Sequence, residues 1–244
     1  MKRNRQMPSG QAFLGCRAAR PLHPAWICVL VSFFILAGTA FADGLRDSLF
    51  THRAESAFVH AQARYRSQMD DPAIAVDFAR ACYDWADWAT NKAQRANIAR
   101  KGIAACQQSL LFTNAAAGHY YMAMNLGQLA RTETLGALKV VRQIERQFLM
   151  AADLDPREDF AGAERGLGLL YRDAPGWPLS IGNRSRAQSY LQGAVALAPN
   201  DPENVLNLAE SELKWGKKMA AKKEMAALDA LWSAAQKSFT GPAW

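Results

Sequence analysis

The sequence predicts an all-α protein built from antiparallel helix pairs, and three observations support this fold class. Apolar residues recur at helical spacing along most of the chain. Alternating runs of β-branched residues, which are typical of strands, are absent. Helix-breaking residues stand where successive helices are expected to end, at Asp71-Pro72, Asp155-Pro156, Ala174-Pro175-Gly176, Pro199 to Pro202, and Gly216.

The first 42 residues have the pattern of a secretory signal peptide. Their five basic residues precede the apolar run 26–37, no acidic residue occurs among them, and Ala40-Phe41-Ala42 forms a small-x-small exit. The apolar run is shorter than the roughly 20 residues that a membrane-spanning helix needs. We therefore expect cleavage near Ala42 and a periplasmic or secreted protein. The alternative is an uncleaved N-terminal anchor, because the basic region is unusually long.

Cleavage of the signal peptide would remove most of the excess positive charge of the chain. The whole chain has 29 basic and 22 acidic residues, a net charge of +7. Removing five basic residues and no acidic one leaves +2. The basic excess of the full chain therefore gives little support to nucleic-acid binding.

Residues 43–71 are predicted to form a lead-in helix, with Leu45, Phe58 and Tyr65 near one face. A degenerate helix pair follows over residues 72–112. It contains Cys82 and Cys106, which an oxidising compartment would allow to pair. Antiparallel packing about the turn near Asn91 puts them about 9 Å out of step along the helix axis. A disulfide needs Cα atoms within about 7 Å, so two separate buried thiols are favoured over a bridge.

The rest of the chain repeats a small, large, small, proline pattern. Ala187, Leu191, Ala194 and Pro199 stand at offsets of 0, 4, 7 and 12. Two other segments have related spacings: Ile144, Phe148, Ala151 and Pro156, and then Ala221, Met225 and Leu228. Each set predicts an amphipathic helix whose small residues allow a neighbouring helix to approach closely. A partner helix precedes each set, which gives pairs over about 116–156, 161–199 and 202 to the end of the chain.

These helix pairs resemble the tetratricopeptide repeat (TPR), whose period is about 34 residues. The resemblance covers residues 72–235, and it implies a right-handed solenoid of TPR-like pairs over residues 72–244 with one continuous core. The sequence departs from the family in its unequal repeat lengths and in lacking an aromatic residue near the start of the first helix in the last two units.

The leader, the size, the irregular pairs and the long loop before Ala187 also look like the periplasmic T-component of TRAP transporters. That resemblance implies a non-catalytic protein that associates with a periplasmic substrate-binding protein.

In a TPR-like solenoid the first helices line a concave groove, which is the expected partner site. Helical aromatic residues such as Trp85 and Trp88 are more often core residues, and the groove is the alternative. Arg165 and Arg172, seven residues apart, would either hold an anionic group together or lie on a solvated face. The candidate groove residues are Trp85, Trp88, Tyr120, Met124, Arg165, Leu169, Arg172, Glu203, Leu206 and Glu210.

The segment 173–183 inserts a loop between two helices and carries one large aromatic residue, Trp177. Two prolines and two glycines give the loop a fixed shape. Either the loop packs as a plug over the end of the solenoid, or Trp177 forms a lip that contacts a ligand or partner.

Motifs for catalysis, metal binding or phosphate binding are absent from the sequence. His119 is expected to be a packing residue, and His52 and His60 to be helix-surface histidines. We therefore predict no catalytic residue, no metal site and no cofactor. The leading hypothesis is an exported scaffold that binds a protein or peptide, with homo-oligomers also open. The alternatives are a small-ligand accessory component of a TRAP-type transporter and, with less support, an enzyme on a helical scaffold.

Overall fold

The chain folds into successive α-helices in a computed structural model that describes residues 49–132 and 137–238. Within these ranges there is no strand, only an isolated bridge between Gly176 and Gly182. The all-α prediction is confirmed. The predicted signal peptide lies outside the described residues. After a helix at 49–67, the helices are α2 (Pro72–Asp87), α3 (Lys92–Phe112), α4 (Ala116–Ala130), α5 (Ala137–Leu154), α6 (Glu158–Asp173), α7 (Arg184–Leu197), α8 (Pro202–Lys214) and α9 (Lys218–Ser238).

Two Asp-Pro pairs among the predicted breakers start helices. The Asp71 carboxylate accepts hydrogen bonds from the backbone N–H groups of Ala73 (2.8 Å) and Ile74 (3.2 Å), with Pro72 in the first turn of α2. Asp201 caps α8 in the same way, with Pro202 after it. An aspartate cap satisfies free backbone donors, and proline costs nothing at a position that lacks a helical acceptor.

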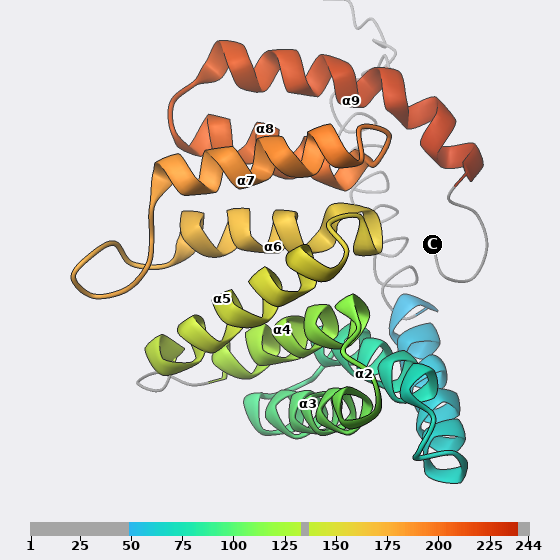
Figure 1. Cartoon of the computed structure of the whole chain (residues 1–244). Coiled ribbons are helices and arrows are strands. Elements are labelled where there is room, and N and C mark those ends of the chain that lie inside the picture. The colour runs from blue at the N-terminus through green and yellow to red at the C-terminus, as the bar shows by residue number, and fades with distance from the viewer. Residues whose placement is uncertain (1–48, 133–136, 239–244) are drawn as a thin grey trace, which may run out of the picture. The chain divides into compact units, whose positions relative to one another are not determined.

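The helices pair in antiparallel fashion as α2/α3, α4/α5, α6/α7 and α8/α9, stacked one after another (Figure 1). We call the leading member of each pair, α2, α4, α6 or α8, its first helix. First helices of neighbouring pairs also contact one another, as α2 with α4, α4 with α6 and α6 with α8, whereas second helices of neighbouring pairs do not contact one another within the described residues. The first helices therefore form the inner side of the stack. This arrangement confirms the predicted solenoid of helix pairs.

The small, large, small pattern forms the interfaces between helices. Ala187, Leu191 and Ala194 on α7 are all fully buried. An added Cβ at Gly168 on α6 would lie 2.6 Å from the Cγ of Leu191, so this glycine permits the close approach of the two helices. In α9 the pattern is only partly buried, since Met225 is exposed. No described helix follows α9 to cover it.

Cys82 and Cys106 are both buried and both free, in agreement with the prediction of two separate thiols. They lie in the hydrophobic core between α2 and α3, together with Phe78. Burial raises the pKa of Cys82 to about 12 and raises that of Cys106 further. Both thiols are therefore protonated packing groups.

Among the described residues, no helix is long and apolar enough to cross a bilayer.

Candidate functional site

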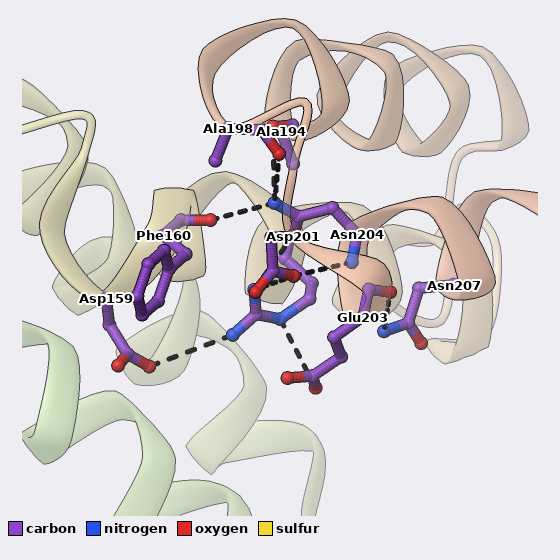
Figure 2. Close-up of polar contacts among 9 residues, drawn as sticks. Asp159, Phe160, Ala194, Ala198, Asp201, Glu203, Asn204 and Asn207 are labelled. Carbon is purple, nitrogen blue, oxygen red and sulfur yellow. Dashed lines mark hydrogen bonds and ion pairs between the residues drawn. The ribbon is translucent and has the colours of Figure 1, made fainter. Parts of the chain in front are cut away.

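A buried arginine organises the inner side of the stack where α6 meets α8. Arg165 is only 7% exposed, yet its guanidinium has a charged or polar neighbour at each nitrogen (Figure 2). Nη1 donates to the Asn204 side-chain oxygen at 2.8 Å. The carboxylates of Glu203, Asp159 and Asp201 lie at 3.4, 3.7 and 3.9 Å from Nε, Nη2 and Nη1. A buried guanidinium needs such partners to offset its loss of hydration.

Asn204 joins three helices around this arginine. Its side-chain amide donates to the backbone oxygens of Phe160 at 2.8 Å and Ala194 at 3.3 Å, so it links α8 to the start of α6 and the end of α7 (Figure 2). Asp159, Phe160 and Ala161 have φ values of 49°, 57° and 62°. Non-glycine residues in the left-handed region are strained and persist where the surroundings hold them. The bond from Asn204 holds this turn, which brings Asp159 to Arg165.

Next to this network lies a cavity of about 170 Å³, which we call the acidic cavity. Its walls carry four carboxylates and two guanidinium groups, a formal net charge of −2. It is lined by Arg80, Tyr83, Asp84, Tyr120, Tyr121, Met124, Asp159, Phe160, Arg165, Asp201 and Glu203.

The excess of carboxylates shows in the pKa of Asp84. Asp84 stays exposed to solvent, but partial desolvation against the cavity wall raises this pKa to about 6, and the negative charges of Asp159 and Asp87 raise it too. Arg80 lowers it, but not enough to reverse the shift. Asp84 has no ion pair within 4 Å among the described residues. The cavity therefore holds negative charge that the chain does not fully neutralise.

Two adjacent tyrosines on α4 line the acidic cavity, and their rings meet edge to face. Tyr120 is 1% exposed and Tyr121 is 6% exposed. Burial, followed by the charge of Asp159, raises the pKa of Tyr121 well above its ordinary value, so its hydroxyl stays protonated. Tyr121 itself lines the acidic cavity, together with three of the charged groups that act on its hydroxyl: Asp159, Arg80 and Asp84. The hydroxyl makes no hydrogen bond with any part of the chain that the structure describes.

A larger hollow of about 400 Å³ adjoins the acidic cavity, and we call it the apolar groove. The two share Tyr83 and Met124, so they are neighbours on the inner side of the stack. The apolar groove is lined by Tyr83, Asp87, Ala123, Met124, Gly127, Gln128, Arg131, Ile144, Phe148, Gly166, Leu169, Leu170 and Asp173.

Five of the groove residues expected from the sequence lie at these two hollows or beside them. Tyr120, Met124, Arg165 and Glu203 line the acidic cavity. Met124 continues into the apolar groove, where Leu169 joins it. Residues from α4, α6 and α8 that the sequence pattern assigned to one groove therefore lie close together in the structure.

Leu206 lines a third hollow, of about 340 Å³ between α8 and α9, which adjoins the acidic cavity because the two share Asp201 and Glu203. That hollow also includes Glu203 and the exposed Trp232. Glu210 is exposed on α8 and lines none of these hollows.

Trp85 on α2 belongs to the hydrophobic core, and Trp88, which caps the end of α2, packs against that core. Trp85 is 9% exposed within the core, and Trp88 packs against the core from its edge. Helical aromatic residues at this spacing stabilise the packing of their pair when they face its partner helix. Trp85 is therefore a core residue, as is usual for helical aromatic residues, and its place among the candidate groove residues is corrected.

The idea that Arg165 and Arg172 jointly hold an anion is also corrected. Arg165 is surrounded by carboxylates of the chain itself. Arg172 pairs with Asp173 at 2.7 Å and donates to the Ser211 hydroxyl at 3.0 Å. Both guanidinium groups are engaged within the fold, so neither is free to bind an anion.

Trp177 does not form a plug, because 89% of its surface is exposed. Backbone hydrogen bonds close the loop beneath it: Gly182 donates to Pro175 and Asn183 donates to Tyr171, both at 2.9 Å. Ile181 packs against the core. The loop is therefore anchored at its base and presents Trp177 to solvent.

Seven residues of the acidic cavity were not among the expected site residues: Arg80, Tyr83, Asp84, Tyr121, Asp159, Phe160 and Asp201. Arg80, Tyr83 and Asp84 share one face of a helix through their spacing of three and four residues, which is a signal that the sequence does contain. Asp159 reaches the cavity through a left-handed turn that no spacing rule predicts.

His119 is 5% exposed and lies between two amide side chains. Its ring nitrogens are 2.6 Å from the Gln147 oxygen and 2.7 Å from the Asn114 oxygen. These contacts suit the expected packing role. In the described part of the chain, no group of histidine, cysteine, aspartate and glutamate is arranged to hold a metal ion.

Comparison with known proteins identifies the fold of the chain, but not a family, a partner or an activity. No family model matches the chain, and no curated protein matches it in sequence. The crystal structure of MamA, a TPR-like helical protein, superposes with a TM-score of 0.51 at 11% sequence identity. The match covers 75% of this chain and 91% of MamA. The resemblance to the TRAP T-component finds no support here. The chain therefore has a TPR-like, all-helical fold.

Proposed function

We propose that this protein is a non-catalytic interaction scaffold that holds a polypeptide segment of a partner on the inner side of its helix stack. The observation that carries the proposal is the adjacency of the acidic cavity and the apolar groove, which share Tyr83 and Met124. Their linings come from α2, α4, α5, α6 and the start of α8, so one bound segment would touch several repeats.

The chemistry of the two hollows suits a polypeptide. Apolar side chains such as Met124 and Leu169 offer contact area for an apolar side chain of the segment. The charges of the acidic cavity next to them would fix the direction in which the segment binds. Repeat proteins with the same stacking commonly use such extended inner surfaces for binding.

Site-specific photo-crosslinking in living cells tests the proposal. A benzoylphenylalanine at Leu169, in the apolar groove, is expected to crosslink one partner protein in near-stoichiometric yield. The control position is Leu111 on α3, which is 77% exposed and lies outside the hollows described above. A merely adhesive surface would crosslink better at the more exposed Leu111. Equal or greater capture at Leu111 would therefore contradict the proposal.

The captured protein also tests the nature of the partner. A second copy of this chain would mean that the surface serves self-association. A periplasmic substrate-binding protein would revive a role beside a transporter.

We also propose that the protein is exported, on the basis of the basic start, the apolar run and the small-x-small exit at residues 40–42. N-terminal sequencing of the protein from its native cells is expected to begin at Asp43. A chain that keeps residues 1–42 and sediments with membranes would favour the uncleaved anchor instead.

A further inference from the structure

Acidic side chains outnumber basic ones in the lining of the acidic cavity, so part of its negative charge is not neutralised by the chain. Arg165 offsets part of the charge of Asp159, Asp201 and Glu203, and all three of these acids contact it. Asp84 remains outside that network, and Arg80 makes no ion pair within 4 Å in the described ranges. An anion entering the cavity would face four carboxylates, whereas a cation would reduce the net charge of −2.

A second, independent feature points to a ligand. Tyr121 lines the cavity and is only 6% exposed as a residue, and its hydroxyl makes no hydrogen bond to the described chain. The hydroxyl oxygen is not fully buried, so a group that enters the cavity can reach it. A hydroxyl oxygen accepts readily from an ammonium or guanidinium N–H.

The walls favour an organic cation. Tyr83 and Tyr121 place aromatic rings beside the carboxylates, and ring faces attract ammonium and guanidinium groups. The neighbouring apolar groove would take the rest of such a ligand if it were part of a polypeptide.

We propose that the acidic cavity receives a lysine or arginine side chain of the partner segment, which pairs with Asp84 and Glu203 and donates to the Tyr121 hydroxyl. An apolar side chain near it in the segment enters the apolar groove beside Leu169. This inference rests on the proposed function, and it adds the chemistry of the partner.

The test begins with random 12-residue peptides displayed on phage and selected against the full chain. The selected peptides are expected to share a lysine or arginine close to an apolar residue. In synthetic peptides, glutamine in place of that basic residue is expected to weaken binding about tenfold, the usual effect of losing a charge-assisted contact.

Variants of the protein locate the contact. Tyr121→Phe removes only the unpaired hydroxyl, and Asp84→Asn removes only a charge. Each is expected to weaken the parent peptide several-fold. In Asp84→Asn the change from the basic residue to glutamine should then matter less than in the native protein, because part of its counter-charge is gone.

Matched controls are Tyr190→Phe on α7, which lies outside the cavity, and Asp77→Asn, an exposed acid on α2. Both are expected to bind the parent peptide as the native protein does.

Spermidine distinguishes a protein partner from a free polyamine. It is expected to bind far more weakly than the peptides, because it has no side chain for the apolar groove. Spermidine binding as tight as the peptides would overturn the assignment to a polypeptide.

The outcomes separate the two proposals. Peptides without a basic residue, or a basic-to-glutamine effect that is unchanged in Asp84→Asn, would overturn the cation assignment. If peptides without a basic residue are selected and Leu169→Asp abolishes their binding, the cation assignment fails but the scaffold function remains supported. Failure to recover any binding peptide, together with no crosslink at Leu169, would contradict both.

Discussion

The charged carboxylate of Asp84 is expected to lower the free energy of unfolding. It faces Arg80 and Asp87 on its own helix and Asp159 from the turn at the start of α6. Partial desolvation and the two acids raise its pKa from 3.8 to about 6 in the folded chain, although the side chain is exposed to solvent. The folded state then binds more protons than the unfolded state between about pH 4 and pH 6, so the free energy of unfolding falls as pH rises through this window.

We therefore predict that Asp84→Asn slightly raises the thermal unfolding temperature at pH 7, where the native carboxyl is charged, and flattens the pH dependence between pH 4 and 6. The effect is small because solvent screens the exposed carboxylate. Circular dichroism melts at several pH values measure this. The control is Asp77→Asn, whose 3.5 Å pair with Arg64 is exposed on both sides and should contribute little. A lower unfolding temperature for Asp84→Asn at pH 7 would contradict this account of the cavity.

The two core cysteines give a second prediction at this scale. Their thiols are buried and their pKa values are raised, so almost no thiolate is present at neutral pH. Iodoacetamide is expected to leave Cys82 and Cys106 unmodified in the native protein and to modify both in denaturant, as peptide mapping by mass spectrometry would show. Rapid native labelling of either would show that this part of the core opens readily.

Individual site residues were only partly predictable from the sequence. Tyr120 and Met124 follow from helical spacing once the repeat register is known. The burial of Arg165 does not follow, because its partners Asp159 and Asp201 come from a left-handed turn and a helix cap. Their convergence depends on how three helices meet.

Among the helices, close approach within a pair depends on small residues. An added Cβ at Gly168 would lie 2.6 Å from the Leu191 side chain and 3.1 Å from its backbone nitrogen. The backbone cannot easily yield, so the two helices would have to separate. Gly127 on α4 has no atom within 4 Å of the same position.

We predict that Gly168→Ala lowers the free energy of unfolding by about 1–3 kcal/mol through overpacking. Gly127→Ala is the control, and it is expected to be neutral or to stabilise by about 0.5–1 kcal/mol because alanine favours a helix interior. Urea unfolding of both variants measures the difference. Equal stability of the two variants would remove the close-contact role of Gly168.

The helices themselves were well predicted, because their signals are local. Asp71 and Asp201 each precede a proline and cap a helix, and both can be recognised within four residues of sequence. The strained turn at 159–161 has no such local signal. Asn204, which holds it, lies more than 40 residues further along the chain.

For the molecule as a whole, the stacking order decides where a partner can bind. In the part of the chain that the structure describes, first helices of neighbouring pairs contact one another and second helices do not, so the two hollows open on the side of the first helices. The predicted repeat pattern was sufficient to place that side. The repeat pattern could not predict the sign of the charge on that side, because this charge depends on side chains from α2, α4, α6 and α8 together.

Hydroxyl-radical footprinting of the full chain with and without its crosslink-identified partner tests this placement most directly. Met124, shared by the two hollows, and Met150, 37% exposed on α5, offer the same chemistry on different helices. We predict that the partner protects Met124 from oxidation and leaves Met150 unchanged. Protection of Met150 with no change at Met124 would contradict a binding surface on the inner side of the stack.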